Sequence, residues 1–161
     1  MGKGSPTNLH LASNVADAIV VVNEGATVSR KEALRVLRPG GIIALWTYEM
    51  FTTDPEVDAV MDDFYRNVVG PYWPRERRHV EERYTSLPFP FEEIASPPFI
   101  LRTQWSLSDV LGYLETWSAV QRYLRIRGRN PVELVADPLA GAWGQGERRL
   151  SWPIHLRAGR G

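Results

Sequence analysis

The alternation of hydrophobic and polar residues in the first third of the chain predicts a buried strand, a helix and a second buried strand. Residues 18–22 form an unbroken apolar run rich in β-branched side chains, which is typical of a strand covered on both faces in a parallel sheet. Ser29 and Glu32 have the spacing of a capping box, so a short helix is expected to begin there. Gly40 suits the left-handed position after that helix, and residues 42–46 predict the second strand. This order indicates a parallel crossover.

The next hydrophobic repeat predicts a helix that begins after Asp54 and ends at Gly70. Asp54 is a good N-cap, and Pro55 suits the first helical position because an amide there would have no partner. The apolar residues that follow recur at spacings of three and four, as expected for one buried helix face, and they are Val57, Val60, Met61, Phe64, Tyr65 and Val68.

The second half of the chain predicts a strand, a helix and a closing strand. Residues 99–105 have the composition of a strand, and Ser106 is a candidate N-cap for a helix that extends to Tyr123. Alternating apolar residues between positions 150 and 156 predict the closing strand. Pro153 lies within it and lacks a backbone donor, so this strand is expected at a sheet edge or with a bulge.

Two segments differ in character from the rest. Residues 1–12 are rich in Gly, Ser and Pro and are expected to form a leader without structure of its own, which leaves residues 13–161 as one domain. Residues 70–98 interleave prolines with aromatic and charged side chains, so an irregular or briefly helical insert is expected. This insert could form a lid or a binding wall, and packing alone could equally explain it.

Composition narrows the classes of function. The 161 residues, 43% of them hydrophobic, suffice for one globular domain, and the 19 basic residues balance the 19 acidic ones. Because the net charge is zero, the chain as a whole does not attract polyanions, so nucleic acid is not expected as a partner. The chain has no Cys and no apolar run long enough to span a membrane, so neither membrane insertion nor export is expected, and we place the protein in the cytoplasm.

Residues 35–46, which include the Arg-Pro-Gly-Gly turn, resemble the junction between the fourth helix and the fifth strand of class I S-adenosylmethionine-dependent methyltransferases. Residues 70–74, 87–91 and 116–123 are similar to the C-terminal region of the bacterial group related to trans-aconitate methyltransferases. The resemblance covers roughly residues 13–160. Several such segments in the same order make coincidence improbable.

The resemblance implies an α/β fold with a Rossmann-like sheet, in the strand order 3-2-1-4-5-7-6, with the last strand antiparallel. This chain would supply strands four to seven, a partial methyltransferase sheet with helices on both faces. S-adenosyl-L-methionine would be the cofactor, bound at the carboxyl ends of the first strands, and a small molecule would accept the methyl group.

The sequence departs from the family in its cofactor-binding half. The acidic-Gly-x-Gly-x-Gly loop and the acidic residue that binds the ribose have no counterpart in the 161 residues. Glu24 follows the first strand and is the one residue in a suitable place for a cofactor contact. We therefore expect a truncated, C-terminal part of the enzyme that is inactive alone. Residues 18–22 would lack their usual neighbour, and this exposed edge invites pairing with a second copy or a partner chain.

The candidate substrate-binding residues are aromatic, because ring faces pack against flat substrates and attract cationic donors. Tyr48 ends the strand where open α/β sheets bind ligands, and Gln121 shares a helical face with Trp117. Core packing is the alternative for the rings. Gln121 with Arg122, or the cluster Arg77–His79, could hold an acidic substrate, and solvated surface charge is the alternative for these residues. The aromatic candidates are Trp46, Tyr48, Tyr72, Trp73, Tyr113 and Trp117.

The histidines predict no catalytic constellation. His10, His79 and His155 are far apart and have neither metal-ligand nor triad spacing, so each is expected to be structural. This does not oppose the resemblance, because methyl transfer mainly requires alignment of donor and acceptor and exclusion of water. Three hypotheses remain: the acceptor-side half of a small-molecule methyltransferase, a non-catalytic module that pairs through its open edge, and a truncated product that barely folds.

Overall fold

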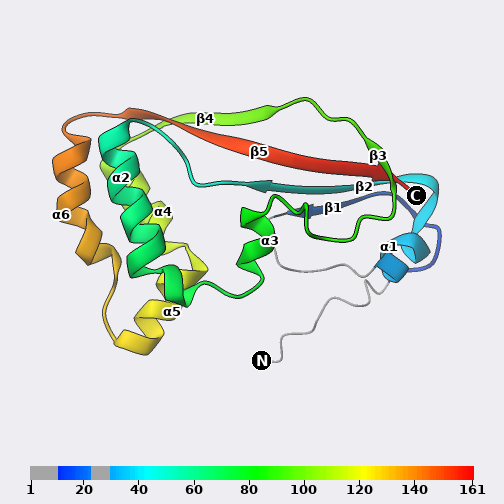
Figure 1. Cartoon of the computed structure of the whole chain (residues 1–161), viewed down its shortest axis with the longest axis horizontal. Coiled ribbons are helices and arrows are strands. Elements are labelled where there is room, and N and C mark those ends of the chain that lie inside the picture. The colour runs from blue at the N-terminus through cyan, green and yellow to red at the C-terminus, as the bar shows by residue number, and fades with distance from the viewer. Residues whose placement is uncertain (1–10, 23–29) are drawn as a thin grey trace. The chain divides into compact units, whose positions relative to one another are not determined.

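The computed structural model describes residues 11–22 and 30–161, and the chain divides into two compact units (Figure 1). The first unit contains the chain up to Glu49 together with Glu76–Ile100 and Pro153–Gly161. The second contains Met50–Arg75 and Leu101–Trp152. The boundaries of the predicted single domain stay a prediction, as does the leader at residues 1–12, most of which lies outside the described residues.

The first unit is built on a parallel strand pair. Strand β1 (Ala16–Val22) pairs with β2 (Leu37–Tyr48) in parallel, with Val20 opposite Ala44, and α1 (Arg30–Val36) connects them. The predicted strand, helix and strand are confirmed. Ala33 of α1 packs with Leu37 and Ile43 of β2 in one core cluster, and this contact fixes α1 against the sheet. Ser29, the predicted cap of α1, lies outside the described residues.

The sheet order matches the one that the resemblance implies. The strands follow the order β1-β2-β5-β3, and β4 (Phe99–Trp105) also pairs with β5 (Arg148–Arg160). The long strand β5 runs antiparallel to β2 and to β3 (Glu92–Ile94). The predicted strands at 18–22, 42–46, 150–156 and 99–105 are β1, β2, β5 and β4, so their order is that of strands four, five, seven and six of the expected sheet, with the last strand antiparallel. The predicted fold class is confirmed.

Pro153 was predicted at a sheet edge or with a bulge. The edge is wrong, because β5 has neighbours on both sides. The bulge agrees with the register, because the next bridge beyond Tyr48 and Ile154 joins Thr52 to Ser151, so that three residues face two across Pro153. Tyr48 opposite Ile154 is the last pair of the ladder between β2 and β5, and the Pro153 carbonyl accepts a hydrogen bond from the Glu49 amide at 3.4 Å. A residue at the end of a ladder needs no donor toward the next pair, so proline is tolerated there.

The predicted helix after Asp54 is confirmed. Helix α2 (Pro55–Asp63) continues as a π-helical turn, η1 (Phe64–Val68), and a short 3-10 turn, η2 (Gly70–Tyr72), follows. The Asp54 carboxylate accepts a hydrogen bond from the Val57 amide at 3.2 Å, so the predicted N-cap is also present. The insert between positions 70 and 98 contains only η2, the short helix α3 (Arg77–Glu81) and β3, as its proline content predicted.

The helix predicted from Ser106 to Tyr123 is two helices, α4 (Leu107–Glu115) and α5 (Ser118–Arg127). Its start is correct, because Ser106 and Asp109 form a capping box. The break comes at Trp117, whose ψ of 132° is extended, and the Thr116 hydroxyl donates to the Tyr113 carbonyl at 2.7 Å. Helix α6 (Val132–Trp143) follows. Within the described residues, no helix is both long enough and apolar enough to cross a bilayer.

Candidate functional site

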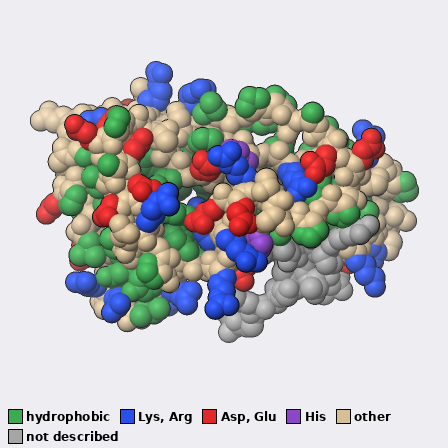
Figure 2. Space-filling model, in the orientation of Figure 1, with side chains coloured by type: hydrophobic (Ala, Val, Ile, Leu, Met, Phe, Trp, Pro, Cys, Tyr) green, Lys and Arg blue, Asp and Glu red, His purple; other side chains and the backbone are tan. Residues whose placement is uncertain are grey.

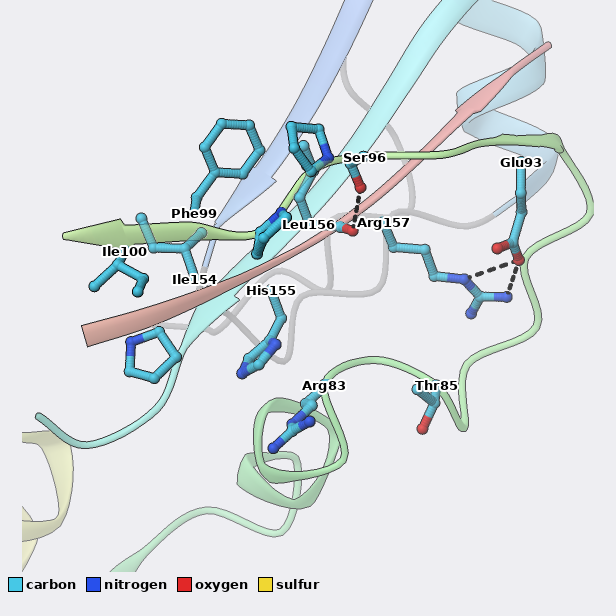
Figure 3. A pocket seen from close by; sticks show the side chains of 13 residues that line it. Arg83, Thr85, Glu93, Ser96, Phe99, Ile100, Ile154, His155, Leu156 and Arg157 are labelled. Carbon is cyan, nitrogen blue, oxygen red and sulfur yellow. Dashed lines mark hydrogen bonds and ion pairs between the residues drawn. The ribbon is translucent and has the colours of Figure 1, made fainter. Parts of the chain in front are cut away.

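A cavity of about 610 Å³ opens in the first unit beside β5 (Figure 3). It lies where the chain passes from β3 to β4. Pro97 and Pro98 in this connection have no amide hydrogen to donate, so they cannot continue the ladder on β5. The Ser96 hydroxyl donates to the Leu156 carbonyl instead, at 3.1 Å. The proline-rich connection therefore opens the sheet locally and leaves room for a ligand.

The lining of the cavity is divided by the alternation of side chains along β5. Ile154 and Leu156 lie near Phe99 and Ile100, whereas His155 and Arg157 extend to the other side of the strand (Figure 3). Phe99 and Ile100 are 44% and 47% exposed, which is unusual for large apolar side chains. The cavity thus combines an apolar wall with polar groups, as small-molecule sites usually do. Its lining residues are Arg83, Thr85, Glu93, Ser96, Pro97, Pro98, Phe99, Ile100, Pro153, Ile154, His155, Leu156 and Arg157.

Two side chains that line the cavity, Arg83 and His155, contact the same carboxylate, that of Glu49. Glu49 follows the last residue of β2, and its Oε1 accepts hydrogen bonds from Arg83 Nε at 2.7 Å and pairs with His155 Nε2 at 2.9 Å. Figure 3 shows His155 and Arg83 on the same side of β5. Because Glu49 lies at the carboxyl end of a parallel strand pair, this group is at the edge where open α/β sheets bind ligands.

The turn that carries Arg83 is strained. Arg83 and Tyr84 have φ angles of 55° and 59°, in the left-handed region that non-glycine residues rarely adopt. Each such residue costs about 1–3 kcal/mol and persists where surrounding contacts enforce it. Here the Tyr84 side chain is buried and Arg83 is bonded to Glu49. Strain of this kind is concentrated at functional sites.

Arg157 braces the same turn. Its Nη1 donates to the Tyr84 carbonyl at 3.0 Å and the Leu87 carbonyl at 2.9 Å, and it forms an ion pair with Glu93 at 2.5 Å. Its guanidinium carbon also lies 4.5 Å from the centre of the Phe89 ring. These contacts use most of the N–H groups of the guanidinium. Arg157 therefore stabilises the wall of the cavity and has little capacity left to bind a ligand.

The predicted substrate-binding aromatics lie in both units. Trp46 and Tyr48 are half-buried on β2 in the first unit, with ring centres 6.3 Å apart. Neither is among the residues that line the cavity. Tyr72 is in the second unit, where its ring lies 4.7 Å from that of Tyr123 and its hydroxyl accepts from Arg127 Nε at 2.7 Å. That hydrogen bond raises the pKa of Arg127.

The remaining predicted residues pack within the second unit. The Trp73 and Trp117 ring centres are 5.5 Å apart, and Tyr113 meets Trp117 edge to face at 5.7 Å. Gln121 Nε2 donates to the Glu115 carbonyl at 2.7 Å, which ties α5 to the end of α4. These contacts account for the packing of the side chains, and their predicted role in substrate binding stays a prediction. Glu24, the predicted cofactor contact, lies outside the described residues.

Sequence reasoning missed the group around Glu49. His155 was expected to be structural, and 106 positions separate it from Glu49 in the sequence. The one available signal was that Glu49 follows the end of a predicted buried strand. His79 pairs with the Ser86 hydroxyl at 3.2 Å on the exposed side of α3, and His10 lies outside the described residues. No group of side chains in the described ranges could hold a metal ion.

Comparison with known proteins adds a family context. No protein-family model matches the sequence. A solved structure from Anaeromyxobacter dehalogenans, described as a candidate type II methyltransferase, superposes with a TM-score of 0.80 and 39% sequence identity over 93% of this chain. A protein of Dictyostelium discoideum, described as a candidate methyltransferase, is 23% identical over 160 residues and 92% of this chain.

This chain spans less than two thirds of the length of these relatives, 66% of the Anaeromyxobacter protein and 61% of the Dictyostelium one. Similarity over nearly all of the present chain, at an identity of 39%, exceeds what a shared architecture alone produces. The chain therefore has a methyltransferase-type, Rossmann-like α/β fold, and its homologues are methyltransferases.

Proposed function

We propose that this chain provides the acceptor-binding part of an S-adenosyl-L-methionine-dependent methyltransferase that acts on a small molecule. The observation that carries the proposal is the 39% identity and TM-score of 0.80 to the Anaeromyxobacter protein over 93% of the chain. The strand order β1-β2-β5, with β5 antiparallel, supports the same assignment. The cavity beside β5 is the proposed acceptor site, because its volume of about 610 Å³ suits a small molecule.

The described residues do not by themselves fit the nucleoside of the methyl donor. A nucleoside site needs a carboxylate that is available to the ribose, and the Glu49 carboxylate at the carboxyl edge is engaged by Arg83 and His155. The glycine turn at Gly40 lies in the irregular part of β2 between the residues Leu37 and Ile42 that pair with β1, toward the opposite end of that strand from Glu49. In the proposed enzyme, residues outside the described ranges, Glu24 among them, therefore hold the donor.

Aromatic side chains near the same edge would complete the acceptor site. Tyr48 ends β2 next to Glu49, and Trp46 lies on the same face of the strand two residues earlier. Tyr72, Trp73, Trp117 and Gln121, which belong to the second unit, stay predictions as substrate-binding residues. Their role would be to position the acceptor and exclude water, which is the main demand of an in-line methyl transfer.

Calorimetric titration with S-adenosyl-L-methionine tests whether the described residues lack a site for the methyl donor. The chain alone is expected to bind the donor weakly or not at all. The chain joined to the part of the Anaeromyxobacter protein that it does not match is expected to bind it with a measurable heat. Tight binding by the 161-residue chain would contradict the proposed absence of a nucleoside site, and no binding by a well-folded joined protein would contradict the methyltransferase proposal.

A second candidate function is a module that pairs through β1 with a second copy or a partner chain. Within the described residues β1 pairs only with β2, and the Val20 side chain is 59% exposed. An uncharged, β-branched strand with an unpaired backbone edge is a template for another strand. This function does not exclude the first, because the proposed partner could carry the donor site.

A further inference from the structure

Glu49 and His155 form a carboxylate–imidazole pair with one ring nitrogen left to face a ligand. A carboxylate can only accept hydrogen bonds, so the 2.9 Å contact assigns the ring proton to His155 Nε2. In the neutral ring Nδ1 is then an acceptor. Within the described part of the chain, Nδ1 makes no hydrogen bond. His155 is 24% exposed and belongs to the lining of the cavity, so a small molecule can reach it.

We propose that His155 is the base that removes a proton from the small molecule held in the cavity, and that Glu49 positions the imidazole for this step. The ligand class is a small molecule with an O–H or N–H group on an apolar body. The O–H or N–H bond breaks, its electron pair stays on the ligand, and the proton forms a bond to Nδ1. The resulting imidazolium is stabilised by Glu49 and later returns the proton to water. This inference rests on the proposed function, in which the lone pair left on the ligand attacks the methyl carbon of the donor and the carbon–sulfur bond breaks, so that the thioether leaves.

Three features favour this role over a purely structural one. The ring is fixed in one tautomer by a carboxylate, which is how a general base is oriented in known catalytic sites. The carboxylate is itself fixed by Arg83, in a turn of two consecutive left-handed residues, and an ordinary surface ion pair would not repay that strain. Pro153 lines the same cavity and lies two residues before His155 on β5, so it shares that side of the strand and can contact the apolar body of the ligand.

The geometry can be tested without a methyl donor or a known acceptor. The probe is diethyl pyrocarbonate, which acylates unprotonated imidazole nitrogens, and mass spectrometry of the full chain locates the modified histidines. His155 is expected to react, and His79, whose Nδ1 contacts the Ser86 hydroxyl and which does not line the cavity, gives the reference rate. In Glu49→Gln the neutral amide no longer holds one tautomer, so the rate at His155 should fall while the rate at His79 stays constant. No reaction at His155, or no effect of E49Q on its rate relative to that of His79, would overturn the proposal.

Methyl transfer by the joined protein described above tests the chemical role. His155→Gln keeps an amide hydrogen near the Nε2 position, so the bond to Glu49 can persist while the base is lost. The turnover number should fall about 10²- to 10⁴-fold with little change in KM, the usual contribution of a general base. His79→Gln should leave both constants unchanged. Full turnover in H155Q would overturn the assignment of the base.

The two proposals fail in distinguishable ways. If His155 reacts as expected with diethyl pyrocarbonate but no methyl transfer is detected with any acceptor, the carboxylate–imidazole pair of Glu49 and His155 is supported and the proposed function is wrong. If methyl transfer is detected and H155Q retains it, the proposed function stands and the base is wrong. Circular dichroism of each variant shows whether it is folded, and Glu49→Asp, which keeps the charge, provides a second variant if E49Q unfolds.

Discussion

At the scale of single residues, the helix caps of this chain depend on neighbouring residues, whereas the group around Glu49 depends on distant ones. Ser106 and Asp109 satisfy each other's backbone amides at the start of α4, and Asp54 does the same for α2. These caps follow from residue types at fixed spacings, so the sequence alone predicts them. The pairing of Glu49 with His155 and Arg83 does not follow from any spacing, because it depends on where three distant segments meet.

The Asp109 carboxylate should make stability depend on pH in the acid range. Hydrogen bonds from the Ser106 hydroxyl and amide hold the pKa of Asp109 below its ordinary value. The folded state therefore binds this proton less tightly than the unfolded state. The stabilisation is fully present above the ordinary carboxyl pKa and is lost as the pH falls through the lowered value. In urea unfolding between pH 2 and 7, the free energy of unfolding of Asp109→Asn should fall less steeply toward acid pH than that of the parent chain.

Asp137→Asn is the matched control for that experiment, since Asp137 is also an exposed helical carboxylate, on α6. It should leave the acid loss of stability unchanged. An identical pH profile for the Asp109 variant and the parent chain would show that the capping box does not contribute.

At the scale of elements, the strand β5 and the turn that it supports define the candidate site. Gly159 on β5 has no room for a side chain, because a Cβ there would lie 2.7 Å from atoms of both Phe89 and Phe91. Gly159→Ala should therefore destabilise the chain by about 1–3 kcal/mol, the usual cost of overpacking. Denaturant unfolding measures this change.

Gly112→Ala is the contrasting variant. A Cβ at Gly112 meets nothing within 4 Å, and the residue lies inside α4, so alanine should stabilise that helix by about 1 kcal/mol. Opposite signs at these two glycines are expected. No destabilisation by Gly159→Ala would contradict the packing around Phe89 and Phe91, and destabilisation by Gly112→Ala would contradict the open space at Gly112.

The Arg157 brace gives a third prediction at this scale. Arg157→Gln removes the hydrogen bonds to the Tyr84 and Leu87 carbonyls, so backbone amides between positions 84 and 91 should exchange with deuterium faster. Arg160→Gln, an exposed change on the same strand, is the control. Unchanged exchange in the Arg157 variant would show that other contacts hold the turn.

Most elements of the fold could be predicted from the sequence, because each depends on a local pattern. The strand at 99–105, the capped helix after Asp54 and the parallel pair β1–β2 follow from periodicity and caps. The break at Trp117 was missed because the apolar spacing continues through it, and only the backbone angles reveal it. Of the two alternatives predicted at Pro153 the edge was wrong, because one proline cannot distinguish a sheet edge from a bulge at the end of a ladder.

At the scale of the whole molecule, the exposed edge of β1 predicts self-association. If β1 pairs with a second copy, sedimentation velocity should show a dimer whose population rises with concentration. Val20→Lys places a charge on the exposed strand and should return the chain to a monomer. Leu134→Lys, at an exposed apolar side chain of α6, is the matched control. A strictly monomeric parent chain at high concentration would rule out pairing through this edge.

The central claim is that this chain carries the acceptor side of a small-molecule methyltransferase. The most direct measurement is the transfer of a radiolabelled methyl group from S-adenosyl-L-methionine by the joined protein, with a cell extract separated into a low-molecular-weight filtrate and a macromolecular retentate. The account predicts label in compounds of the filtrate, and none with the part of the Anaeromyxobacter protein alone. Label confined to the retentate, or none in either fraction from a joined protein that binds the donor, would contradict it.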